Sequence, residues 1–212
     1  MISIFVASAL GGYLLGSIPF GLVLCYIAGL GDIRKIGSGN IGATYVLRTG
    51  RKDLALATVL LDASKAGIAA WVAGLLAPEN DMLVMGIMTK TNTLVALIAG
   101  TSAILGHNFP IWLGFKGGKG VASAFGFIVV MSPTLGLLAL LTWLVFAFAF
   151  RYSSLSAIAA ATLTPVYAYF FAGEMEAIFF SMIALLVLIR HHANIVRLVK
   201  GTESKISFKK KA

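Results

Sequence analysis

The chain has 212 residues, of which 59% are hydrophobic and only 12% are charged, and its formal net charge is +9. Soluble domains carry about 25% charged residues, so this composition excludes an ordinary soluble domain and indicates an all-α polytopic membrane protein. Membrane sidedness and anionic lipid headgroups account for the positive charge, so we predict no nucleic-acid partner. We predict a single integral membrane domain over residues 1–212, with a basic tail at about 204–212.

Seven apolar runs follow one another along the chain, and a helix needs about 20 such residues to cross the hydrocarbon core. The first run has no basic segment before it and is too long for the apolar region of a signal peptide, so we interpret it as a retained span. The third and fourth runs are short and flank a glycine-rich stretch, which predicts a short or re-entrant segment there. The predicted spans cover approximately residues 2–30, 54–76, 93–106, 121–132, 134–150, 155–172 and 176–190.

Basic residues collect in alternate breaks between these runs. The segment 31–53, the glycine-rich stretch, Arg151 and the tail from Arg190 onward hold fifteen of the seventeen lysines and arginines. By the positive-inside rule this side is cytoplasmic, so we predict an external N-terminus and a cytoplasmic C-terminus. The opposite breaks hold Glu79, Asp81, Lys90, Glu174 and Glu176.

The first basic break contains the sequence IGSGNIGATYVLR at 36–48. Ser38, Gly39 and Asn40 precede a predicted helix, so that Ser38 or Asn40 would cap it while unpaired N–H groups face an anion. Arg48 lies about two helical turns beyond Asn40 and adds a positive charge. Arginines that only reach lipid headgroups need no such glycine and amide neighbours, so the stretch indicates a binding site.

The second polar stretch is HNFPIWLGFKGGKGVA at 107–122. It is not a P-loop, because only three residues separate Gly114 from Gly118, and Gly120 stands where the magnesium-binding hydroxyl would be. Glycines still let backbone N–H groups approach an anion, and lysines neutralise its charge. The predicted phosphate cradle consists of Lys116, Gly117, Gly118, Lys119 and Gly120.

The third polar stretch is RHHANIVRLVKGTE at 190–203. Asn194 and Arg197 are three residues apart and therefore share one helical face, to which His191 also belongs. The three stretches all lie at predicted cytoplasmic ends of spans. Together they predict a pocket for more than one phosphate group at the membrane surface.

Several catalytic classes lack the residues that they need. The chain has no HExxH motif and only one cysteine, Cys25, so we predict no metal site and no cofactor. No histidine is followed by an aspartate five positions later, which excludes the mechanism of soluble-type glycerolipid acyltransferases. An enzyme with this composition would need a substrate that is already activated.

Two non-enzymatic alternatives stay open. A transporter of phosphate compounds would also use glycines and cations, but no internal repeat is visible. Only Asp62 and Lys65 break the apolar interior, and we predict that they pair near the active side. A non-catalytic scaffold leaves the three polar stretches without a function.

The motifs SGNIGATxxxR, GHxFPxxxxFKGGKGVA and HxxNIxRLxxGxE resemble the three cytoplasmic motifs of the bacterial acyl-phosphate:glycerol-3-phosphate acyltransferases, the PlsY family. LLDASKAG at 60–67 and RYSSLS at 151–156 are also similar to that family, and the order agrees over essentially the whole chain. Two positions depart from the family pattern. Tyr45 stands in place of the usual Asn, and Ser123 stands in place of the usual Thr.

The resemblance implies transfer of an acyl chain from acyl phosphate to the 1-hydroxyl of sn-glycerol 3-phosphate, which yields 1-acyl-glycerol 3-phosphate (lysophosphatidic acid) and phosphate. This would be the first acylation step of bacterial phospholipid synthesis, at the cytoplasmic side of the plasma (inner) membrane. It implies membrane lipid as surroundings and a functional link to the enzyme that makes acyl phosphate from acyl carrier protein. The reaction that the resemblance implies requires neither a metal nor a cofactor.

The polar stretches and the resemblance together predict the site residues. The base that takes the hydroxyl proton is either His191 or the phosphate of the donor, and the donor phosphate is favoured because no carboxylate is placed to orient a histidine. We expect Glu203 to fix the tail. The predicted catalytic residues are Ser38, Arg48, Lys116, His191 and Asn194; those predicted to bind substrate or phosphate are Gly39, Asn40, Gly117, Gly118, Lys119, Gly120, Ser153, Ser154, Arg197 and Glu203.

Overall fold

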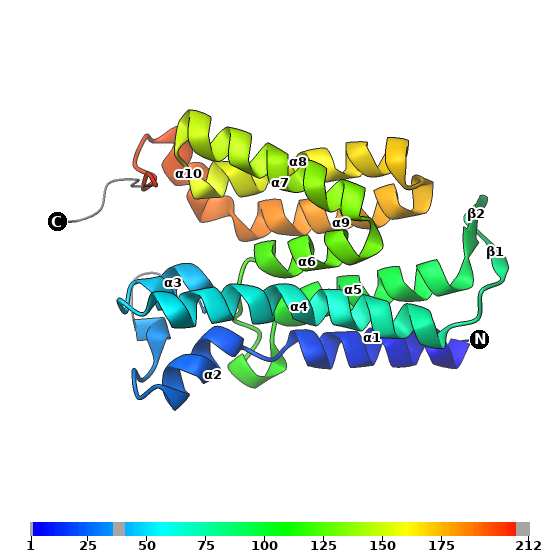
Figure 1. Cartoon of the computed structure of the whole chain (residues 1–212), viewed down its shortest axis with the longest axis horizontal. Coiled ribbons are helices and arrows are strands. Elements are labelled where there is room, and N and C mark those ends of the chain that lie inside the picture. The colour runs from blue at the N-terminus through cyan, green and yellow to red at the C-terminus, as the bar shows by residue number, and fades with distance from the viewer. Residues whose placement is uncertain (1, 36–40, 207–212) are drawn as a thin grey trace. The chain divides into compact units, whose positions relative to one another are not determined.

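The computed structural model describes residues 2–35 and 41–206, and most of these residues are helical (Figure 1). The predicted all-α membrane class is therefore confirmed, apart from one short hairpin. The chain divides into two compact units, residues 1–131 and residues 132–212. The single integral membrane domain over residues 1–212 stays a prediction.

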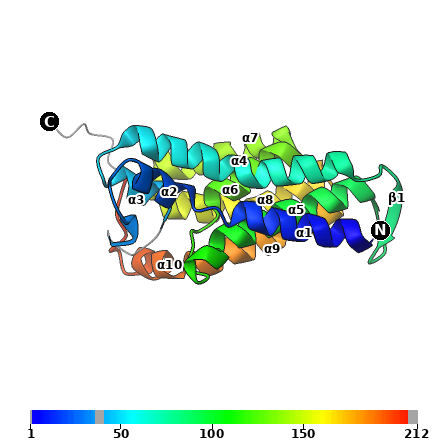
Figure 2. The same ribbon diagram turned by 90° about the horizontal axis from the view of Figure 1, so that it is seen from below.

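The first unit is built around three long helices, α1, α4 and α5, which run side by side in both ribbon views, with α6 packed along α4 (Figures 1 and 2). The first predicted span is split in two, because Pro19 lacks the N–H group that would continue the helix. The elements of this unit are α1 (Ile2–Gly16), α2 (Phe20–Ile27), α3 (Ala43–Leu47), α4 (Lys52–Leu76), β1 (Asp81–Val84), β2 (Ile87–Lys90), α5 (Thr91–Asn108) and α6 (Val121–Met131).

Helices α1 and α5 approach each other very closely. A Cβ atom at Gly16 would lie 1.9 Å from the carbonyl oxygen of Ala103, and one at Gly12 would lie 2.3 Å from that of Ala99. Any larger residue would therefore force the helices apart. Small residues at helix contacts are typical of membrane proteins, where close van der Waals packing replaces the hydrophobic effect between helices.

A two-stranded antiparallel hairpin joins α4 to α5. Strand β1 pairs with β2 so that Asp81 lies opposite Lys90 and Val84 opposite Ile87. The two turn residues, Met85 and Gly86, have positive φ values of 53° and 83°, as a tight hairpin turn requires. The sequence did not predict this hairpin, because methionine is an unusual residue for the first of these positions.

The second unit consists of α7 (Pro133–Phe150), α8 (Ser153–Phe171), α9 (Glu174–Arg190) and α10 (His192–Val199), with α8 packed against both α7 and α9. Helix α7 begins where the Ser132 hydroxyl accepts a hydrogen bond from the Leu135 N–H, with Pro133 in the first helical position. Helices α9 and α10 meet at a bend of 62°.

Among the described residues, five helical stretches are long and apolar enough to cross a membrane, with α1 and α2 counted as one stretch, or six if α9 and α10 together form one span. Helix α6 has only 11 residues, which agrees with the predicted short segment beside the glycine-rich stretch. Helix α5 is longer than predicted, with 18 residues. Seven crossings and a re-entrant path stay predictions.

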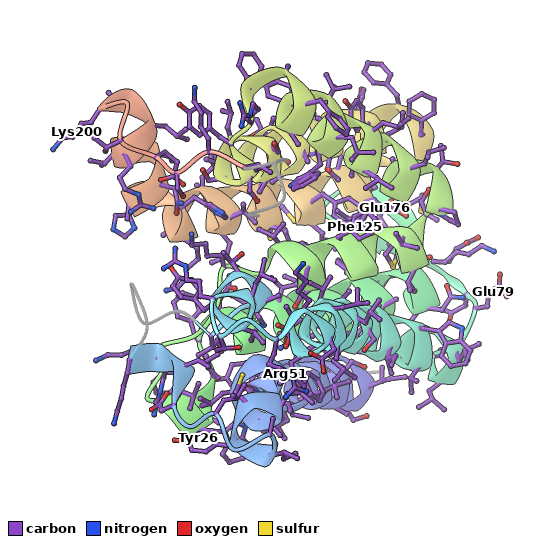
Figure 3. The ribbon with its side chains drawn as sticks, turned by 60° about the vertical axis from the view of Figure 1, so that its left-hand side comes forward. Tyr26, Arg51, Glu79, Phe125, Glu176 and Lys200 are labelled. Carbon is purple, nitrogen blue, oxygen red and sulfur yellow. The ribbon has the colours of Figure 1, made fainter. Side chains whose placement is uncertain are left out.

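Charged side chains mark the two ends of α4. Arg51 precedes this helix and Glu79 follows it, and both are labelled in Figure 3. Arg51 pairs with Asp53 at 2.6 Å, whereas Glu79 pairs with Lys90 of the hairpin. The orientation of these two ends relative to the membrane stays a prediction.

Candidate functional site

The first motif is only partly described. Ser38, Gly39 and Asn40 lie outside the described residues. Helix α3 begins at Ala43 with Gly42 in the N-cap position, and the expected contribution of Ser38 or Asn40 to this helix end stays a prediction. Arg48 directly follows α3, and its guanidinium carbon lies 4.8 Å from the centre of the Tyr45 ring. Since Arg48 is exposed, this cation–π contact steadies a cation that solvent and ligands can reach.

The glycine-rich loop between α5 and α6 is folded onto the end of α5. The Gly117 N–H donates to the Asn108 carbonyl at 3.1 Å, and the Gly118 N–H donates to the His107 carbonyl at 3.0 Å. These bonds satisfy carbonyls that the end of a helix leaves without partners. The expectation that these two N–H groups face a phosphate is therefore wrong. Lys116 is exposed and Lys119 is half-buried.

The loop needs glycine because of its packing against α5. A Cβ atom at Gly118 would lie 2.0 Å from the His107 Nε2 atom. Gly120 has a φ of +79°, in the left-handed region that favours glycine. Both requirements arise inside the protein, so they do not depend on a bound phosphate.

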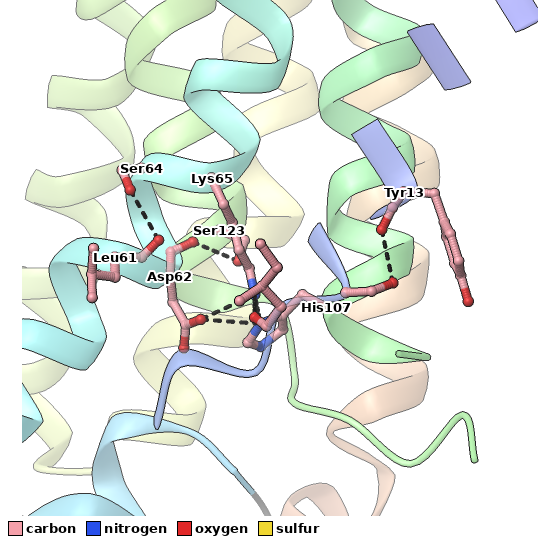
Figure 4. Close-up of polar contacts among 9 residues, drawn as sticks. Tyr13, Leu61, Asp62, Ser64, Lys65, His107 and Ser123 are labelled. Atoms are coloured by element: carbon pink, nitrogen blue, oxygen red, sulfur yellow. Dashed lines mark hydrogen bonds and ion pairs between the residues drawn. The ribbon is translucent and has the colours of Figure 1, made fainter. Parts of the chain in front are cut away.

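Beside this loop lies a buried polar cluster, which consists of Asp62, Lys65, His107 and Ser123 (Figure 4). The Lys65 ammonium forms an ion pair with Asp62 Oδ1 at 3.0 Å, which confirms the predicted pair. It also contacts His107 Nδ1 at 2.8 Å and donates to the Ile18 carbonyl at 3.1 Å. Because an ammonium can only donate, His107 Nδ1 is the acceptor in this contact.

The fourth member, Ser123, lies in the first turn of α6. Its hydroxyl donates to the backbone carbonyl of Asp62 at 2.7 Å. Asp62 Oδ1 also lies 3.6 Å from His107 Nδ1, so a carboxylate stands beside this histidine. The DxxK spacing revealed the pair in the sequence, but no local pattern joined His107 and Ser123 to it.

In the second unit, three predicted site residues converge on Glu203; we call Ser154, Asn194, Arg197 and Glu203 the Glu203 cluster. Glu203 Oε1 accepts hydrogen bonds from the Ser154 hydroxyl at 2.7 Å and from the Asn194 amide at 2.6 Å. Its Oε2 atom accepts one from Arg197 Nε at 2.6 Å. The carboxylate therefore joins the start of α8 to α10, which confirms that Glu203 fixes the tail. Ser153 is exposed at the first position of α8.

These contacts shift the titration of Glu203. Partial burial alone would raise the pKa of this carboxyl, but the hydrogen bonds from Asn194, Ser154 and Arg197 and the positive charge of Arg197 outweigh it. The pKa is therefore below its ordinary value, and Glu203 is ionised at neutral pH. An ionised carboxylate accepts all three hydrogen bonds at once.

His191 occupies the bend between α9 and α10 and is buried. Its Nδ1 atom lies 2.8 Å from the Val187 carbonyl oxygen. A carbonyl can only accept, so Nδ1 carries a proton, and in the neutral ring Nε2 is the nitrogen that holds the lone pair. The Val187 carbonyl thus orients the ring and selects the neutral tautomer in which Nε2 can accept a proton or a hydrogen bond from a hydroxyl group.

Metal ligands are not grouped in the part of the chain that the structure describes, where no three His, Cys, Asp or Glu side chains lie close enough to hold an ion. The chemistry available in that part comes from exposed cations, two buried imidazoles and amide donors. Such groups bind phosphate oxygens and position a hydroxyl group.

Comparison with known proteins gives consistent results. A family model described as glycerol-3-phosphate acyltransferase matches residues 6–201. The glycerol-3-phosphate acyltransferase of Rhodospirillum rubrum is 58% identical over 204 residues, which cover 96% of this chain and 92% of the relative. That of Paramagnetospirillum magneticum is 52% identical over 206 residues, which cover 97% and 96% of the two chains.

Solved structures agree with these relatives. The crystal structure of PlsY (YgiH), an integral membrane glycerol 3-phosphate acyltransferase, in its glycerol 3-phosphate form is 34% identical, with a TM-score of 0.83 and coverage of 96% of both chains. Its lysophosphatidic acid form gives a TM-score of 0.82 at 33% identity, covering 96% of this chain and 95% of that one.

Proposed function

Because the chain belongs to the glycerol-3-phosphate acyltransferase family, we propose that it transfers an acyl chain from acyl phosphate to the 1-hydroxyl of sn-glycerol 3-phosphate. The observation that carries this proposal is the extent of the family match. It covers residues 6–201, which include the first two motifs completely and the third up to Gly201. The solved relative, in glycerol 3-phosphate and lysophosphatidic acid forms, supports the acceptor and the product.

The proposed reaction needs positioning more than bond activation. Acyl phosphate is a mixed anhydride, so its carbonyl carbon is already electrophilic. The acceptor oxygen attacks that carbon, the bond from the carbonyl carbon to the phosphate oxygen breaks, and its electron pair leaves with the phosphate. Exposed Arg48 and Lys116 suit the binding of phosphate oxygens, and charge stabilisation of this kind supplies the largest catalytic effect in many enzymes.

The residues of the third motif are proposed to position the acceptor. Glu203 accepts hydrogen bonds from both Asn194 and Arg197 and so orients them. Arg197 donates its Nε–H there, and its guanidinium has further N–H groups that can bind glycerol 3-phosphate. The hydroxyl proton goes either to the donor phosphate or to Nε2 of His191, and the orientation of His191 by Val187 is compatible with both routes.

The cellular setting belongs to the same proposal. We place the reaction at the cytoplasmic side of the bacterial inner membrane, as the first acylation step of phospholipid synthesis. An enzyme that makes acyl phosphate from acyl carrier protein would supply the donor. The basic end of α4 supports this orientation through the positive-inside rule.

Purified protein in detergent tests the function directly. With acyl phosphate and glycerol 3-phosphate we expect equal amounts of lysophosphatidic acid and inorganic phosphate. We expect no product when the acyl donor is acyl-CoA or acyl carrier protein that carries an acyl chain. Lys116→Ala should lower kcat by about 100- to 1,000-fold, the cost of one oxyanion donor. Product formation from acyl-CoA alone would contradict the proposed donor. Uptake of glycerol 3-phosphate into proteoliposomes without any acyl donor would favour the transport alternative.

His191→Asn separates the two proton acceptors. If the donor phosphate takes the proton, this variant should mainly raise the KM for glycerol 3-phosphate and leave the pH profile of kcat unchanged. A fall in kcat with loss of a titration near pH 6–7 would identify His191 as the base.

A further inference from the structure

Both ends of the glycine-rich loop are attached to a single turn of α4. On one side, His107 in the last turn of α5 contacts Lys65. On the other side, Ser123 in the first turn of α6 donates to the Asp62 carbonyl. Asp62 and Lys65 are three residues apart on α4, and Figure 4 shows the contacts meeting there.

This attachment is buried and charged. The Lys65 side chain is only 1% exposed, and Ser123 is fully buried. Burying a charge is costly unless it stays paired, so Lys65 is held close to Asp62 and to the Ile18 carbonyl. A group restricted in this way is a fixed point from which α5 and α6 can be positioned.

The loop itself rests on the same histidine. The Gly118 N–H donates to the His107 carbonyl, and the His107 ring occupies the space where a Gly118 side chain would lie. A shift of this ring therefore shifts the loop. Lys116 is two residues from Gly118, so its position depends on His107.

We propose that Asp62, Lys65, His107 and Ser123 act together as positioning residues, which fix both ends of the glycine-rich loop and thereby set the position of Lys116. None of them needs to touch the substrate. The inference rests on the proposed function only for the part that Lys116 plays in the reaction.

Two matched serine variants test this attachment. Ser123→Ala removes the hydrogen bond between α6 and α4, whereas Ser64→Ala removes a hydrogen bond from the Ser64 hydroxyl to the Leu61 carbonyl within α4. Trypsin cleaves after Lys116 and Lys119 when the loop opens. We expect Ser123→Ala to raise the rate of these cleavages about five-fold, the equivalent of one hydrogen bond, and Ser64→Ala to leave it unchanged. Ser123→Thr keeps the hydroxyl group and should restore resistance.

Activity then links the loop to the reaction. In Ser123→Ala we expect a fall in kcat of about five-fold with little change in the KM for glycerol 3-phosphate, because Lys116 is displaced while the third motif is intact. Ser64→Ala should show normal kinetics. If no variant releases phosphate, the proposed function fails, but the cleavage rates still decide whether the loop is attached as inferred.

The double variant Asp62→Asn with Lys65→Met provides a second test, because it removes both buried charges together and leaves neither unpaired. It should remain folded, as judged by monodisperse elution in detergent, and still show faster cleavage after Lys116. Equal cleavage rates in wild type, Ser123→Ala and the double variant would overturn the proposal. So would equal losses of kcat in Ser123→Ala and Ser64→Ala.

Discussion

The buried polar cluster and the Glu203 cluster each join two or more helices and each contain one ion pair, but they differ in exposure. Lys65 is 1% exposed, whereas the Arg197 side chain is 44% exposed. In the first cluster a charge without its partner cannot reach water. In the second, water can take the place of a lost partner at Arg197. Breaking the ion pair in the buried polar cluster should therefore cost much more free energy than breaking the ion pair in the Glu203 cluster.

The largest expected effect comes from Lys65→Met. This change leaves Asp62 buried without its cation, and removing one partner of a buried pair typically costs about 3–5 kcal/mol. We expect low yield and an apparent Tm in detergent well below that of wild type. The double variant with Asp62→Asn is the control and should recover most of this loss. If the two variants unfold at the same temperature, the buried charge is not the cause.

Gly118→Ala should cost somewhat less. Its Cβ atom would lie 2.0 Å from His107 Nε2, and overpacking of this kind typically costs about 1–3 kcal/mol. Because the clash is with the ring, Gly118→Ala combined with His107→Ala should relieve the strain that Gly118→Ala introduces. The measurement is the apparent Tm of the single and double variants. An additive loss in the double variant would place the steric conflict elsewhere.

Glu203→Gln tests the second cluster through pH. The pKa of Glu203 is lower in the folded protein than the ordinary value of about 4.3, so its stabilisation is fully present above that value and is lost as pH falls through the folded pKa. Near pH 7 the variant should be less stable by about 1.5 kcal/mol. Between about pH 5 and 3 the apparent Tm of wild type should fall more steeply than that of the variant. Parallel curves would show that this carboxylate does not titrate with folding.

Arg197→Gln should have the smallest effect on stability, at most about 1 kcal/mol, because its ion pair with Glu203 is partly exposed. Added salt should weaken wild type toward the variant, as screening predicts. A loss comparable with that of Lys65→Met would remove the distinction between the two clusters. Activity assays on the same variant report separately on the proposed binding of glycerol 3-phosphate.

The sequence predicted the helices well, because runs of apolar residues determine where a chain crosses the membrane. It also predicted the Asp62–Lys65 pair, since residues three apart share a helical face. It did not predict that His107 and Ser123 join this pair, because such contacts depend on how α5 and α6 pack on α4. For the same reason, the sequence did not indicate that the Gly117 and Gly118 N–H groups donate to carbonyls at the end of α5. Glycines that permit close packing and glycines that bind anions have the same sequence signature.

The glycine surface of α1 also has a consequence for biogenesis. Gly12 and Gly16 are the positions where the backbone of α1 packs closely against α5. The ribosome makes all of α4 and the hairpin before it makes α5. Since synthesis proceeds from the N-terminus, α1 is made before α5 and faces lipid without this partner. Two stages follow, insertion of α1 as a separate helix and its later lateral association with α5. Helix α1 must therefore remain stable in the lipid until α5 has been translated.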